Sequence, residues 1–67
     1  MSVARVTEII SSSKNSFEDA IEKGIKRAVK TLKNVEGAWV KQQKVIVKNG
    51  KISEYRVDLK VTFVLID

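Results

Sequence analysis

The feature that most constrains the fold is a long alternation near the C-terminus. From Lys51 to Ile66, apolar and polar residues take turns along the chain. This period of two predicts one strand with an apolar face and a polar face. A strand of this length spans roughly 50 Å, which is more than a core with a single helix requires. The apolar face comprises Tyr55, Val57, Leu59, Val61, Phe63 and Leu65, and the polar face comprises Glu54, Arg56, Asp58, Lys60 and Thr62.

A second long strand precedes this one. The stretch Val35–Lys48 is rich in Val, Ile, Trp and Gln, and Asn49-Gly50 follows it. Both turn residues tolerate positive φ, so we expect a type I′ turn and an antiparallel hairpin. The apolar phase changes along Val35–Lys48, which predicts a bulge near Gln42–Lys44. The face away from the core is expected to include Gly37, Trp39, Val45 and Val47.

The N-terminal half predicts a strand and a helix. Val3–Ile10 is typical of a strand, and the polar cluster Ser11–Asn15 predicts a loop. An amphipathic helix is then indicated by apolar residues with helical spacing, namely Phe17, Ala20, Ile21, Gly24, Ile25, Ala28, Val29 and Leu32. Asn15 or Ser16 is expected to cap this helix, Asn34 to terminate it, and Asp19 to pair with Lys23. Gly24 on the apolar stripe indicates a close approach, either by a neighbouring strand or by a symmetry mate.

The element order therefore predicts an α+β fold. We expect β-α-β-β topology, with a three-stranded antiparallel sheet packed on one helix, in a single domain covering residues 1–67. A chain of 67 residues without cysteine buries too little apolar surface to be comfortably stable alone. Association with copies of itself is the expected source of the missing stability.

Composition excludes much chemistry. The chain has no Cys and no His, so disulfides, thiol nucleophiles, Ser-His triads and imidazole bases are absent. We therefore expect a protein without enzymatic activity. No run of about 18 apolar residues and no signal peptide are evident, so we expect a cytoplasmic protein without a membrane partner.

The charge is uneven, with a net value of +5. Between Glu36 and Glu54 there is no acidic residue, whereas Lys41, Lys44, Lys48 and Lys51 all fall there. These lysines either protect exposed strands from edge pairing or attract a phosphate-bearing ligand. Nucleic acid is not expected as a partner, because the chain lacks a GxxG loop and its strand aromatics lie in the core phase.

Trp39 is the only tryptophan, and its phase is opposite to that of the core. It is either buried in a subunit interface or forms a stacking platform for a planar ligand. Carboxylates offer a further alternative, because Glu8, Glu36, Glu54, Asp58 and Asp67 could supply oxygen ligands to a hard cation on a symmetry axis. No calcium-binding loop is present, so salt bridges to lysines are the competing interpretation.

Nearly the whole chain resembles the dodecin family. The resemblance rests on the opening strand, on Ser11-Ser12-Ser13 with Ser16-Phe17-Glu18, on the helix end Ala28–Val35, on Ala38-Trp39-Val40, and on Glu54-Tyr55-Arg56-Val57 with Val61-Thr62-Phe63. It implies a hollow homododecamer that stores or sequesters flavin without catalysis. In this family a tryptophan at the start of the second strand stacks on the flavin, and a glutamine in the third strand holds it.

Aligned on this resemblance, the stacking tryptophan falls on Gly37 and the glutamine on Arg56. Trp39 lies two positions further along, about 7 Å away on the same face. Lys44 falls where some bacterial dodecins carry an arginine that faces a ligand phosphate. The expected ligand is riboflavin, FMN or a related nucleotide, bound by Trp39, Arg56, Lys44 and Gly37. The alternative is a flavin-free shell with a structural or calcium-type metal-binding role, as the resemblance implies for members without the tryptophan.

Overall fold

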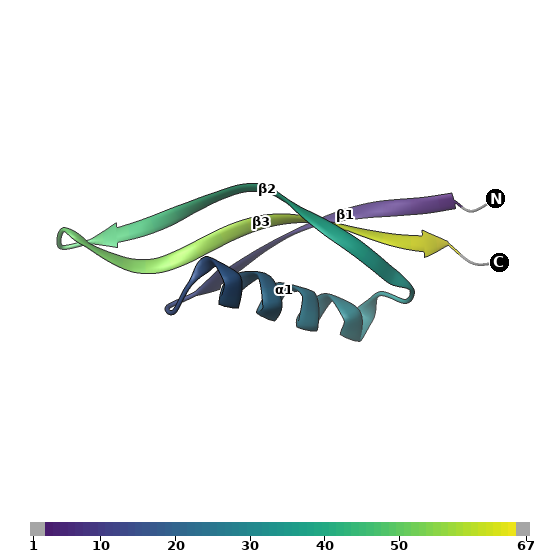
Figure 1. Cartoon of the computed structure of the whole chain (residues 1–67), viewed down its shortest axis with the longest axis horizontal. Coiled ribbons are helices and arrows are strands. Elements are labelled where there is room, and N and C mark those ends of the chain that lie inside the picture. The colour runs from purple at the N-terminus through teal and green to yellow at the C-terminus, as the bar shows by residue number, and fades with distance from the viewer. Residues whose placement is uncertain (1–2, 66–67) are drawn as a thin grey trace.

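The computed structural model describes residues 3–65, which form three strands and one helix. Their order is β1 (Val3–Ser13), α1 (Phe17–Thr31), β2 (Val35–Lys48) and β3 (Lys51–Leu65). The strands make one antiparallel sheet in the order β1-β3-β2, and α1 crosses one face of it (Figure 1). The predicted topology and fold class are confirmed. Ile66, the end of the predicted last strand, lies outside the described residues.

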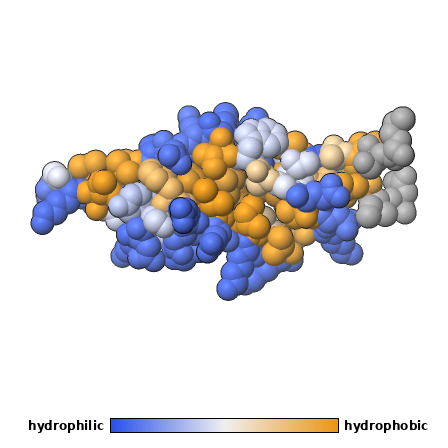
Figure 2. All heavy atoms as spheres, in the orientation of Figure 1, coloured by the Kyte–Doolittle hydropathy of each residue, from blue (hydrophilic) through white to orange (hydrophobic). Residues whose placement is uncertain are grey.

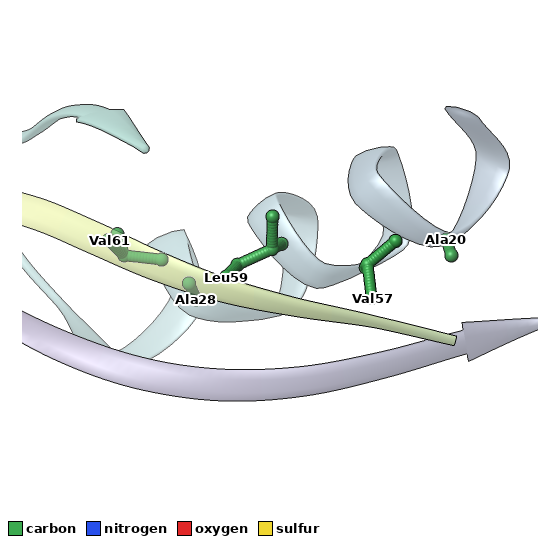
Figure 3. Packing of buried hydrophobic residues seen from close by; sticks show 5 residues of the cluster. All are labelled: Ala20, Ala28, Val57, Leu59 and Val61. Atoms are coloured by element: carbon green, nitrogen blue, oxygen red, sulfur yellow. The ribbon is translucent and has the colours of Figure 1, made fainter. Parts of the chain in front are cut away.

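The core lies between β3 and α1, because β3 is the central strand. Val57, Leu59 and Val61 project from it and are almost completely buried, together with Ala20 and Ala28 of the helix (Figure 3). The alternation predicted for this strand therefore matches the helix-facing side. At one end of the core the rings of Phe17 and Tyr55 meet edge to face, with centroids 5.1 Å apart.

Gly24 lies where α1 comes closest to the sheet. A Cβ added to Gly24 would lie 2.9 Å from Leu59 Cδ1 and 3.1 Å from Ser11 Cβ. Real Cβ atoms do not pack so tightly, so a side chain at this position would force Leu59 or the helix to shift. The predicted close approach is confirmed, and β1 and β3 of the same chain provide it.

The first strand is longer than the sequence predicted. β1 continues through Ser11–Ser13, which pair with Val57, Arg56 and Tyr55 of β3, so the loop prediction is wrong for these three serines. Burial of the Ser13 hydroxyl is made possible by two hydrogen bonds. Its Oγ donates to Asp19 and accepts from the Asn15 N–H at 2.9 Å. The hydroxyl is thus satisfied, and the strand can extend under the start of the helix.

The helix ends follow the predicted signals. Ser16 is the N-cap, and its Oγ accepts a hydrogen bond from the Asp19 N–H at 3.0 Å. Asp19 also pairs with Lys23, at 3.0 Å, as expected for residues four apart. Leu32 closes the helix through its N–H, and Asn34 takes a positive φ of 62° just beyond it.

The bulge in β2 is real but begins earlier than predicted. The pairing register shifts between Val40 and Gln42, so Lys41 is the extra residue. This shift returns Val45 to the helix-facing side, where it pairs with Tyr55. The expectation that Val45 faces away from the core is therefore wrong. A bulge adds one residue to the strand, and from there on the residues that face the helix change from even to odd numbers. Val40 and Val45 therefore share a face although they are five residues apart.

The hairpin extends well beyond the helix. Asn49 and Gly50 have φ values of 54° and 74°, which confirms the predicted turn with positive φ at both positions. Because β1 ends opposite Tyr55, the tip of the hairpin has no third strand beside it (Figure 1). Val47 and Ile52 are exposed there, and Figure 2 shows hydrophobic atoms gathered beside the tip. The chain measures 51 × 19 × 14 Å as a result.

Candidate functional site

All four predicted site residues lie on the sheet face opposite α1, which we call the outer face. Gly37 pairs with Thr62, Trp39 pairs with Lys60, and Lys44 pairs with Arg56. Cross-strand partners share a face, and residues 56, 60 and 62 alternate with the buried core residues of β3. The bulge at Lys41 is what brings Trp39 and Lys44 to the same face despite their odd spacing.

Trp39 stands half-exposed on this face, with 51% of its surface accessible. Gly37, two residues away on the same strand, is also exposed, and an added Cβ would meet no atom within 4 Å. An open area therefore lies beside an accessible indole ring. Such an area is suited to a flat aromatic ligand or to a neighbouring subunit.

Lys44 and Arg56 line a pocket of about 330 Å³ on the outer face. The remaining lining residues are Ile10, Gln42, Gln43, Val57 and Asp58. Arg56 is already paired with the Glu54 carboxylate, two residues along β3. The pocket thus combines two cations, two amide side chains, two apolar residues and one carboxyl group. The two cations suit it to an anionic group on a larger ligand.

The predicted site is divided into two parts within one protomer. The pocket includes Lys44 and Arg56 but neither Trp39 nor Gly37. Lys60 and Arg56, the partners of Trp39 and Lys44, are four residues apart on β3, which corresponds to about 13 Å. A ligand that touches both parts of one chain must therefore be extended.

Asp58 and Glu8 are two carboxylates that lie together on the outer face. The sequence did not indicate that they are neighbours. Asp58 is only 8% exposed, and its Oδ1 accepts no hydrogen bond from any described N–H or O–H group. Its neighbour on β1 is Glu8, which pairs with Lys41 at 3.5 Å. The sequence predicted a solvent-facing aspartate, but the flanking strands cover this position of the central strand. The alternation of apolar and polar residues in β3 indicates on which face of the sheet a side chain lies. It does not indicate whether the flanking strands bury that side chain, so the burial of Asp58 has no signal in the sequence.

The two carboxyls perturb each other. Burial raises the pKa of Asp58, and the hydrogen bond and negative charge of Glu8 raise it further. The same hydrogen bond lowers the pKa of Glu8, and Lys41 and Lys60 act in that direction too. One carboxyl therefore tends to keep its proton while the other stays ionised.

Within residues 3–65, no group of three or more acidic side chains is arranged to hold a metal ion. The described part of the chain also contains no helix that is long and apolar enough to cross a membrane.

Comparisons with known proteins identify the fold and the family. A model of the family described as Dodecin matches residues 3–66. The chain belongs to the dodecin family. Dodecins are small flavin-binding proteins that form homododecamers. Among curated proteins, none matches the chain significantly.

Several solved dodecins are similar over nearly the full length. A dodecin from Streptomyces davaonensis is 33% identical with a TM-score of 0.93, covering 98% of this chain and 97% of that one. An arginine-to-alanine variant of the Thermus thermophilus dodecin is 30% identical with a TM-score of 0.93, and both chains are covered completely. A calcium dodecin from Mycobacterium tuberculosis, described as having a novel calcium-binding site, is 30% identical with a TM-score of 0.83. That match covers 96% of this chain and 91% of the other.

Proposed function

We propose that this dodecin is a non-catalytic binding or storage protein for a flavin or a related nucleotide. Trp39 forms the stacking surface, Lys44 and Arg56 pair with a ligand phosphate, and Gly37 leaves room beside the ring. Residues 1–67 act as one domain of a hollow homododecamer in the cytoplasm. Riboflavin and FMN are the ligands that fit this arrangement.

The observation that carries the proposal is the shared face of Trp39, Lys44 and Arg56. The indole is half-exposed, and the two cations are cross-strand partners that line the pocket. An aromatic surface binds the ring of a flavin, and paired cations bind its phosphate. Because these parts are separated by about 13 Å in one chain, an extended ligand or a second subunit bridges them.

Assembly is supported by the apolar surface that one chain leaves uncovered. The exposed large hydrophobic residues of the described chain are Val3, Val6, Ile10, Val29, Trp39, Val40, Val47, Ile52 and Leu65. Burial of this surface between subunits would supply the stability that the small core lacks. The dodecamer typical of the family meets this need.

A fluorescence titration tests flavin binding directly. The chain has one tryptophan, so its emission reports only on Trp39. Riboflavin and FMN are expected to quench this emission, and FMN is expected to bind more tightly because of its phosphate. Protein as purified should also absorb at flavin wavelengths if it carries ligand. Unchanged emission at high micromolar flavin would refute the proposal.

The second candidate is a flavin-free shell with a structural or calcium-binding role. It is favoured by the likeness to the calcium dodecin and by Gly37 and Arg56 at the two positions where the family's flavin contacts fall. Under this alternative Trp39 packs between subunits. Trp39→Ala would then dissociate the assembly on a sizing column, whereas a ligand-stacking Trp39 would leave the elution volume unchanged and abolish flavin uptake. Calorimetric titration with calcium tests whether the protein binds this metal.

A further inference from the structure

Four charged side chains meet on the outer face between the pocket and Trp39. Glu8 comes from β1, Lys41 from the bulge of β2, and Asp58 and Lys60 from β3. Glu8 pairs across the strands with Lys60, and Asp58 pairs with Ile10. Glu8 and Asp58 are therefore diagonal neighbours on the outer face, a separation that long side chains can bridge.

A hydrogen bond between two carboxyl groups requires a proton, because an ionised carboxylate can only accept. Asp58 is more than nine-tenths buried, and its Oδ1 has no donor among the described residues. Lys41 reaches Glu8, at 3.5 Å, instead of Asp58. A shared proton would therefore satisfy the buried oxygen that the lysines leave without a partner.

We infer that Glu8 and Asp58 hold one proton between them, and that this proton sets the charge of the adjoining pocket, of which Asp58 forms part of the wall. The pocket also contains Lys44 and Arg56, and Arg56 is partly neutralised by Glu54. With the proton in place, Asp58 adds no negative charge beside the two cations. When the proton leaves, a carboxylate appears in the wall and opposes the binding of an anion.

The neighbouring charges agree with this assignment. Burial and the negative charge of Glu8 both raise the pKa of Asp58, and they outweigh the opposite effect of Lys41 and Lys60. Asp58 therefore keeps its proton to a higher pH than an ordinary aspartate and releases it as the pH rises further. Anion affinity at the pocket should fall in the same interval. This consequence for ligand binding rests on the proposed function, whereas the proton site itself does not.

The proton site is tested by following the side-chain carboxyl ¹³C signals of the assembled protein during a pH titration. Asp58 is expected to titrate above its ordinary value of 3.8, and Glu8 below its ordinary value of 4.5. Glu8→Gln removes the neighbouring charge and should move the Asp58 midpoint downward. Glu36→Gln, at an exposed position of β2, is the matched control and should leave that midpoint unchanged. An Asp58 that titrates at or below its ordinary value would overturn the inference.

The effect on the pocket is tested by flavin affinity below and above the pH interval in which the ¹³C signal of Asp58 titrates. FMN should bind the wild type about threefold to tenfold more weakly above this interval than below it, relative to Asp58→Asn at the same pH values. The second ionisation of the phosphate, near pH 6, affects both proteins alike and cancels in this ratio. Riboflavin lacks the phosphate and should show a smaller change. Equal pH dependence of FMN binding in the two proteins would overturn the inference. Absence of all flavin binding would refute the proposed function instead, and the ¹³C titration would then test on its own whether Glu8 and Asp58 share a proton.

Discussion

Gly24 of α1 and Leu59 of β3 are in such close contact that a side chain at position 24 would force one of them to move. An added Cβ would lie 2.9 Å from Leu59 Cδ1, and Leu59 itself is 1% exposed and cannot move into solvent. This contact fixes the distance between the helix and the central strand, and with it the thickness of the core.

Gly24→Val should therefore destabilise the protein. The added methyl groups must push α1 away from Leu59 and Ser11, which costs about 2–3 kcal/mol of unfolding free energy. Gly37→Val is the matched control, because the same side chain meets no atom within 4 Å there. Chemical denaturation of both variants measures the difference. Equal midpoints would show that the helix can shift without cost.

Gly37→Trp should create or strengthen flavin binding. The substitution adds an indole at the position where the family resemblance puts the stacking tryptophan, and the space around Gly37 is open. Stacking of one aromatic ring contributes about 1–3 kcal/mol, so riboflavin affinity should rise about tenfold or more. Quenching of riboflavin fluorescence measures the affinity. Gly37→Leu controls for added apolar area, and equal gains from both variants would argue against stacking.

Asp19 should stabilise the protein in a pH-dependent way. The Ser13 hydroxyl, and then Lys23, lower the pKa of Asp19 in the folded state. Its contribution is therefore complete above the ordinary value of 3.8 and is lost as the pH falls through the folded pKa. Asp19→Asn should flatten the acid limb of a plot of thermal midpoint against pH. Glu22→Gln, at an exposed helix position, serves as the comparison, and an unchanged acid limb in Asp19→Asn would contradict the prediction.

Gly50→Ala should weaken the hairpin turn. Gly50 has a φ of 74°, and a side chain in this left-handed region costs about 1–2 kcal/mol. The loss should appear as a lower thermal midpoint of the assembled protein. Asn49→Gly, at the other positive-φ position, should be tolerated. If Gly50→Ala retains the wild-type midpoint, the turn is not strained by a side chain.

The fold could be predicted from the sequence to a large extent because its signals are local. Alternation in β3, the apolar stripe of α1 and Asn49-Gly50 each follow from the chemistry of neighbouring residues. The end of β1 could not be predicted, since Ser13 is buried only because Asp19 of another element accepts its hydrogen bond. The face on which Val45 lies depends on the extra residue Lys41 in the bulge. A shift of one residue in the register moves every following side chain to the other face.

Of the candidate site, only the face of the sheet on which it lies could be predicted from the sequence. The sequence indicated that Trp39 points away from the core, and the structure agrees. It did not reveal that Lys44 and Arg56 line a pocket separate from Trp39, nor that Asp58 is buried between β1 and β2. Both properties depend on which strands flank β3, and that order is a tertiary feature that periodicity does not encode.

The free tip of the β2–β3 hairpin is expected to become stable later than the rest of the chain. A two-stranded ribbon is marginally stable in water, and residues 46–54 have no partner on β1 in the sheet. We expect their amides to exchange with deuterium rapidly in an isolated subunit and slowly once subunits have joined. Slow exchange at the tip would therefore report that subunits have associated, and the rate of exchange would report how often they separate.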